Sequence, residues 1–143
     1  MSGSSVSTEV VSRLGCLLGA TALEHRRDGW WLQVPLGQVI AMAETMLQSG
    51  ARLGTMTGSE LQRGETVVIY HYVLGEAAIN IRTESRDRSL PSITPITRAA
   101  DWIEREIHDL FGVAFVGHPN LTRLIRPPQV PPGLFRAPEA TQA

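Results

Sequence analysis

Residues 66–83 read TVVIYHYVLGEAAINIRT, and this stretch decides the fold. Residues 66–74 are dominated by β-branched and aromatic side chains, which favour a strand. Gly75 allows a tight turn, and residues 77–83 then alternate apolar with polar side chains. The stretch therefore predicts a β-hairpin, with one face of its second strand turned to solvent.

The segments on either side of this hairpin show helical and strand patterns in turn. Helices are expected at residues 10–18, 36–48 and 97–111, and shorter strands within 21–34, at 51–56 and at 113–116. Residues 59–64 predict a polar loop and residues 85–95 an irregular connection. This order predicts an α+β fold, in which helices pack on one face of a mainly antiparallel sheet.

A chain of 143 residues suits one compact domain. Residues 1–8 are rich in serine and predict a loose N-terminus, and the domain is expected at residues 9–125. Residues 126–143 are rich in proline, which cannot continue a helix or a central strand. They predict a tail that is either disordered or extended in a polyproline-like form against another surface.

Composition excludes several classes of function. The formal net charge is −1, so no basic field attracts nucleic acid. Cys16 is the only cysteine, so the chain cannot close an internal disulfide or hold an iron–sulfur cluster unaided. The start of the chain lacks the pattern of a signal peptide, and no apolar run is long enough to span a bilayer. A cytoplasmic protein is expected, and peripheral attachment to a membrane complex is compatible with the sequence.

The helix expected at 97–111 is the most charged segment of the chain. At about 100° per residue, one arc carries the apolar side chains that form its core face. These are Ala99, Ile103, Ile107, Leu110 and Phe111. Asp101, Glu104, Arg105 and His108 fall on the opposite side, where solvent is expected.

Two residues of this helix lie at the margins of the two faces. Glu106 falls beside the apolar arc, so its carboxylate is expected to be partly desolvated and to need a partner. Trp102 falls among the charged residues, away from the core. An exposed tryptophan beside arginine and glutamate is typical of an interface anchor.

A metal site is one alternative interpretation of this segment. Glu104 and His108 are four residues apart on one helix, and His118 follows ten residues later, so the three side chains could form a zinc site. The sequence contains no HExxH motif, phosphate-binding loop, dinucleotide fingerprint or nucleophile motif. No catalytic residue is therefore assigned.

A dense motif occupies residues 104–123. It comprises Glu104-Arg105-Glu106, Asp109, Phe111-Gly112, Gly117-His118-Pro119-Asn120-Leu121 and Arg123. This motif resembles the signature of the C subunit of bacterial NADH–quinone oxidoreductase (complex I). The same family includes the related small subunit of membrane-bound nickel–iron hydrogenases.

The resemblance implies a non-catalytic subunit of the hydrophilic arm, without a cofactor of its own. Its implied partners are the large catalytic subunit, which carries the quinone or nickel–iron site, and the small iron–sulfur subunit. Its implied place is the cytoplasmic face of the membrane, reached through the complex. The motif and the exposed tryptophan together predict these partner-interface residues: Trp102, Glu104, Arg105, Glu106, Asp109, His118, Pro119 and Arg123.

The chain departs from the respiratory pattern after Arg123. Respiratory members of the family have an Asp-Trp-x-Gly-x-Pro-Leu-Arg element after this motif, whereas this chain continues as LIRPPQVPPGLFRAPEATQA. This difference favours the shorter hydrogenase-type member, although the sequence does not decide between the two complexes. The alternatives are a stand-alone metal-dependent enzyme using Glu104, His108 and His118, or a soluble interaction module.

Overall fold

A computed structural model describes residues 8–124 and 128–134 of the chain. Most of the predicted loose N-terminus and much of the predicted proline-rich tail lie outside these ranges. The helices are α1 (Thr8–Leu17), the 3₁₀ helix η2 (Leu36–Gln38), α2 (Val39–Gln48) and α3 (Ala100–Phe111). The strands are β1 (Ala22–Arg26), β2 (Gly29–Gln33), β3 (Arg52–Glu60), β4 (Thr66–Leu74), β5 (Ala77–Ser85), β6 (Ser89–Pro91) and β7 (Ala114–Val116).

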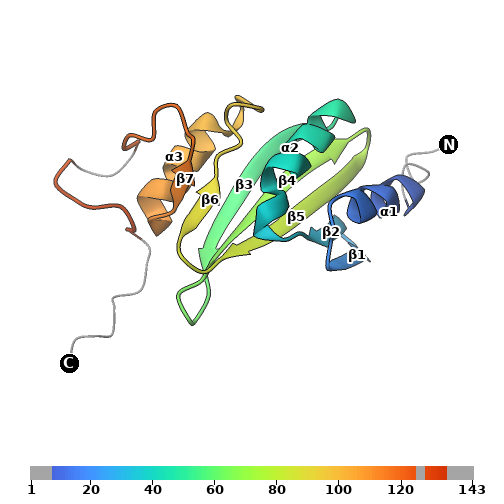
Figure 1. Cartoon of the computed structure of the whole chain (residues 1–143), viewed down its shortest axis with the longest axis horizontal. Helices are drawn as coiled ribbons and strands as arrows, with labels where there is room; N and C mark the ends of the chain where they lie inside the picture. Colours follow the sequence, from blue (N-terminus) through green and yellow to red (C-terminus); the bar gives the residue numbers. More distant parts are fainter. Residues whose placement is uncertain (1–7, 125–127, 135–143) are drawn as a thin grey trace.

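The predicted hairpin forms the centre of a five-stranded sheet with the order β1-β2-β5-β4-β3 (Figure 1). Strands β4 and β5 pair antiparallel from Thr66 opposite Ser85 to Leu74 opposite Ala77. Strand β3 pairs antiparallel with β4, and β1 with β2, whereas β2 runs parallel to β5. The prediction of an α+β fold with a mainly antiparallel sheet is confirmed.

Helices α1, α2 and α3 lie on one face of this sheet. In β4 the side chains of Val68, Tyr70 and Tyr72 are buried on that face, whereas Val73 on the other face is exposed. Gly15 of α1 lies against Leu32 of β2 on the same side. Burial of these apolar side chains on one face is the main stabilising contribution to the fold.

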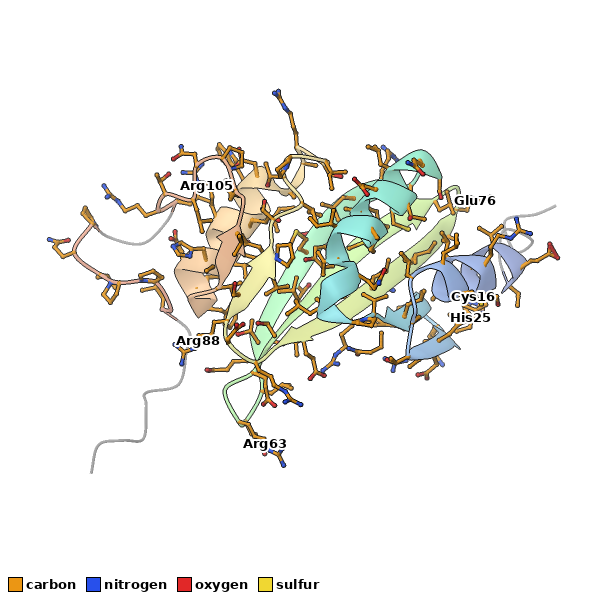
Figure 2. All side chains as sticks on the ribbon, in the orientation of Figure 1. Cys16, His25, Arg63, Glu76, Arg88 and Arg105 are labelled. Carbon is orange, nitrogen blue, oxygen red and sulfur yellow. The ribbon has the colours of Figure 1, made fainter. Side chains whose placement is uncertain are left out.

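Strands β3 and β5 differ in part from the sequence prediction. Strand β3 continues to Glu60, through the start of the predicted polar loop, because pairing with β4 satisfies its backbone whatever its side chains are. The remaining loop joins β3 to β4, and Arg63 projects from it (Figure 2). The prediction that one face of β5 is exposed is also wrong at Asn80, which is only 6% exposed. Its side chain donates to the carbonyl of Trp30 and is hydrogen-bonded to His71, so its polar atoms have partners within the protein.

The region predicted to be irregular, 85–95, contains strand β6. It pairs in parallel with β7, with Leu90 opposite Phe115, and α3 forms the connection between them. Parallel strands require such a crossover. The β6–α3–β7 unit lies beside β3, and Gly112 ends α3 in the left-handed conformation (φ 69°), as its sequence position predicted.

Helix α3 approaches β3 closely because Gly58 has no side chain. A Cβ atom on Gly58 would lie 3.0 Å from Cγ2 of Ile107 and 3.2 Å from Cδ2 of Phe111. The lack of a side chain at Gly58 therefore allows α3 to pack closely on the sheet. A hydrophobicity pattern does not reveal such a contact.

We expect Gly58→Ala to lower the free energy of unfolding by about 1–3 kcal/mol, because the added methyl group overpacks the contact with α3. Gly37→Ala is the control, since a Cβ there meets nothing within 4 Å. It should change the free energy of unfolding by less than about 0.5 kcal/mol. Urea denaturation measures both, and equal stability of the two variants would contradict the packing described.

Candidate functional site

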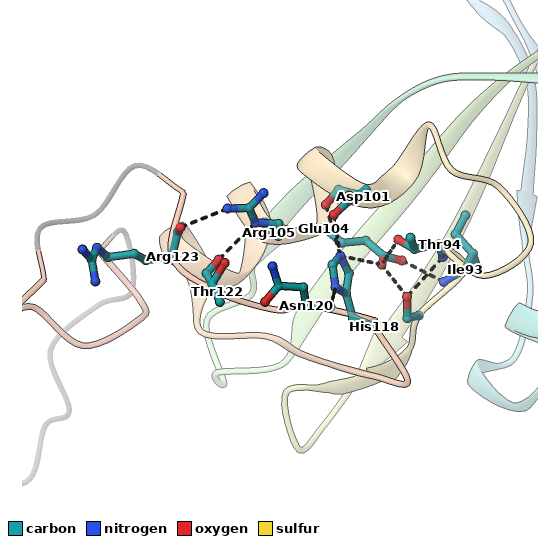
Figure 3. A network of polar contacts seen from close by, with 10 residues as sticks. Ile93, Thr94, Asp101, Glu104, Arg105, His118, Asn120, Thr122 and Arg123 are labelled. Atoms are coloured by element: carbon teal, nitrogen blue, oxygen red, sulfur yellow. Dashed lines mark hydrogen bonds and ion pairs between the residues drawn. The ribbon is translucent and has the colours of Figure 1, made fainter.

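The site is built around a carboxylate on α3 that solvent does not reach. Glu104 is 0% exposed. The hydroxyls of Ser92 and Thr94 donate to its Oε1 at 2.6 and 2.7 Å, and the backbone N–H of Ile93 donates to its Oε2 at 2.8 Å (Figure 3). A buried charge requires such partners, so this carboxylate fixes the segment that follows β6 against the helix.

His118 reaches the same centre from the segment that follows β7. Its Nδ1 accepts the backbone N–H of Asn120 at 2.9 Å, so the proton of the neutral ring lies on Nε2. Nε2 lies 3.3 Å from the carbonyl oxygen of Asp101, 3.0 Å from its Oδ1 and 4.0 Å from Oε1 of Glu104. The histidine side chain is 1% exposed, so the second loop is also fixed to α3.

Two further residues of α3 hold the chain beyond His118. Arg105 donates to the carbonyls of Thr122 and Arg123 at 3.2 and 3.1 Å. The Oδ2 of Asp109, whose side chain is buried, accepts the N–H of Leu124 at 2.7 Å. The carbonyl of Asp109 also accepts the N–H groups of Gly133 and Leu134 at 2.8 and 3.0 Å.

The predicted position of Glu106 is wrong. Glu106 is exposed, and the buried carboxylates of the helix are Glu104 and Asp109. The predicted exposure of Glu104 assumed that α3 packs against the sheet on one side and faces solvent on the other. The loops that follow β6 and β7 cover a second side of α3 and bury Glu104 there. Trp102 is 67% exposed, as predicted.

The remaining predicted residues lie at the surface of the same unit. Pro119 and Arg123 are exposed in the segment that follows β7. Ser92 and Thr94 were not among the predicted site residues. Two hydroxyl residues shortly before a charged helix were the available signal, because such side chains can donate to a buried carboxylate.

The structure does not assemble the proposed three-ligand metal site. His108 turns its Nδ1 to the carbonyl of Val113 at 2.8 Å. The carboxylate of Glu104 accepts hydrogen bonds from other groups of the protein. Of the two other proposed ligands, only His118 lies near it. Within residues 8–124 and 128–134, no group of three or more His, Cys, Asp or Glu side chains could hold a metal ion. Nor does any helix in these ranges have the length and apolar character required to cross a membrane.

Comparison with known proteins gives consistent matches. The sequence model of a family described as "Respiratory-chain NADH dehydrogenase, 30 Kd subunit" matches residues 32–137. The C/D subunit of the NADH-quinone oxidoreductase of Methylococcus capsulatus is 48% identical over 65 residues, which cover 43% of this chain and 11% of that protein. The corresponding protein of Nitrosospira multiformis is 43% identical over 65 residues, with the same coverage. The chain thus matches about a tenth of the length of these relatives.

The fold is shared with chains of solved structures. The trypsin-resistant fragment of Nqo5 superposes with a TM-score of 0.65 at 23% identity, over 79% of this chain and 97% of that one. A chain of the membrane-bound sulfane sulfur reductase, an archaeal respiratory membrane complex, superposes with a TM-score of 0.65 at 26% identity. That match covers 77% of this chain and 70% of the other.

We expect Glu104→Ala to lower the free energy of unfolding by about 3 kcal/mol or more, because it leaves three buried donors without their acceptor. Glu106→Ala is the matched control, since the same truncation at an exposed position should cost less than about 0.5 kcal/mol. Chemical denaturation of both variants measures the difference. A larger loss for Glu106→Ala would show that the buried carboxylate has been misidentified.

The stability of the protein should also depend on pH through Glu104. Burial, the largest cause, raises the pKa of Glu104 above its ordinary value of 4.5, although its hydrogen bonds and His118 lower it. The native state therefore holds this proton more tightly than the unfolded state, so stability from this group is lost as pH rises through the folded-state pKa.

We expect the free energy of unfolding of the native protein to fall relative to that of Glu104→Gln as the pH rises above 4.5. The amide cannot ionise, so the difference between the two proteins isolates this group. Urea denaturation at a series of pH values measures it. Two curves that stay parallel between pH 4.5 and neutrality would exclude the raised pKa.

Proposed function

Because the chain belongs to the family of the 30 Kd subunit of respiratory-chain NADH dehydrogenase, we propose that it is a non-catalytic subunit of a membrane-bound oxidoreductase. In this proposal it forms part of the hydrophilic arm. It supports electron transfer by docking the large catalytic subunit and the small iron–sulfur subunit, and contributes no cofactor of its own.

The use of the polar residues of the site supports this proposal. The carboxylate of Glu104 accepts hydrogen bonds from within the chain, and Arg105 and Asp109 bind backbone groups of the segment after β7. These side chains are occupied in holding loops, as expected for a docking surface that must keep its shape. A catalytic acid or base would instead have to face a reacting group.

The observation that carries the proposal is the exposure of Trp102. It is 67% exposed on α3, whose other sides are held by the sheet and by the two loops. A large aromatic side chain on a rigid helix is suited to anchor a partner. We assign direct contact with the partner to Trp102, Glu106, Pro119 and Arg123, and support of this surface to Glu104, Arg105, Asp109 and His118.

The type of complex is a finer part of the proposal. The curated relatives are named as subunits of NADH–quinone oxidoreductase, and one structural relative belongs to an archaeal respiratory membrane complex. Both the respiratory and the hydrogenase-type complexes fit the site. In either complex we place the chain on the cytoplasmic face of the membrane, held there by its partner subunits. Genes for hydrogenase or complex I subunits beside its own would separate the two.

Purification of the tagged full chain from native membranes tests the proposal. We expect it to recover a large catalytic subunit and an iron–sulfur subunit, identified by mass spectrometry and iron content. Trp102→Ala should reduce that recovery at least about tenfold, as for the loss of an aromatic anchor. Leu17→Ala is the control, because Leu17 is 65% exposed on α1. Purification of the chain without any redox subunit would refute the proposal.

A further inference from the structure

A second feature of the surface lies near the start of α3. A pocket of about 270 Å³ opens between the end of α2, the start of β3 and the turn that precedes α3. Leu47, Leu53, Tyr72 and Ala99 are among the residues that line it. Figure 1 shows the end of α2 and the turn before α3 along the upper side of the molecule.

The rim of this pocket combines exposed apolar surface with positive charge. Leu47, the penultimate residue of α2, is 54% exposed, and Ala99 is also exposed. Arg52 lines the pocket and is exposed. Arg98, which precedes Ala99, is exposed as well. Within the described ranges, neither arginine belongs to an ion pair that the structure contains.

Size and position indicate what kind of occupant fits. Sites for cofactors and drug-sized ligands have volumes of about 300–1,000 Å³, and this pocket is smaller. It suits one large apolar side chain of a protein. Ala99, which lines the pocket, directly precedes α3, so the pocket lies next to the start of the helix that carries the proposed docking surface.

We propose that this pocket receives an apolar anchor side chain of a neighbouring subunit of the complex, and that a carboxylate beside the anchor pairs with Arg52. The inference rests on the proposed function, because it supplies a second contact for the same docking event. The anchor provides buried apolar area, and the arginine fixes the register of the partner segment.

Paired substitutions in the tagged full chain, purified from native membranes, test this contact. Leu47→Asp and Arg52→Glu should each reduce the recovered redox subunits at least about tenfold. Leu17→Asp is the control for the first, since Leu17 is also an exposed leucine at the end of a helix. Arg63→Glu is the control for the second, because it makes the same charge change in the loop between β3 and β4 (Figure 2). Both controls should recover the subunits at the level of the native chain.

A second measurement covers the case in which Leu47→Asp impairs folding. A photo-crosslinking residue in place of Ala99 should form a covalent link to a redox subunit in the intact complex, and one in place of Leu17 should not. Normal recovery by all four variants, or no crosslink from position 99, would overturn the pocket contact and leave the proposed function intact. A native chain that recovers no redox subunit would overturn both.

Discussion

The carboxylate of Glu104 determines how the second half of the fold is arranged. It is buried on α3, and its three donors come from consecutive residues after β6. An ionised carboxylate without these donors would be strongly unfavourable in the protein interior. Any arrangement that keeps Glu104 inside must therefore place residues 92–94 beside the helix. The pairing of β6 with β7 then brings the segment after β7 to the same side.

At Glu104 the cost of desolvation is set against the hydrogen bonds of the carboxylate, and the result favours a specific arrangement over maximal stability. Burial raises its pKa, which shows that desolvation outweighs the hydrogen bonds that favour the charged form. An apolar side chain at this position would avoid that cost, but it could not orient two loops. A hydrogen-bonded carboxylate accepts donors only from certain directions, so it fixes loop conformation in a way that apolar packing does not.

The parts of the fold that sequence could predict are those set by local pattern. The central hairpin, the three α-helices and the terminating Gly112 follow from side-chain periodicity and backbone preference, and they formed close to the predicted positions. Strand β6 and the burial of Glu104 instead depend on contacts between segments far apart in sequence. A helical rotation identifies one apolar arc, and it contains no information about a second layer that covers a polar arc. For this reason Glu104 was predicted to be exposed and Glu106 to be partly buried, whereas the structure has the reverse.

The residues of the family motif divide into those that support the surface and those that lie on it. Glu104, Arg105, Asp109 and His118 are engaged within the chain, and each orders backbone that would otherwise be free to move. Ordering a loop costs conformational entropy, and a loop ordered at binding would lower the affinity by that amount. A domain that orders these loops during folding presents its partner with a surface already in place. If the chain docks partner subunits as proposed, such preorganisation is a physical reason to keep a buried polar network beneath an exposed tryptophan.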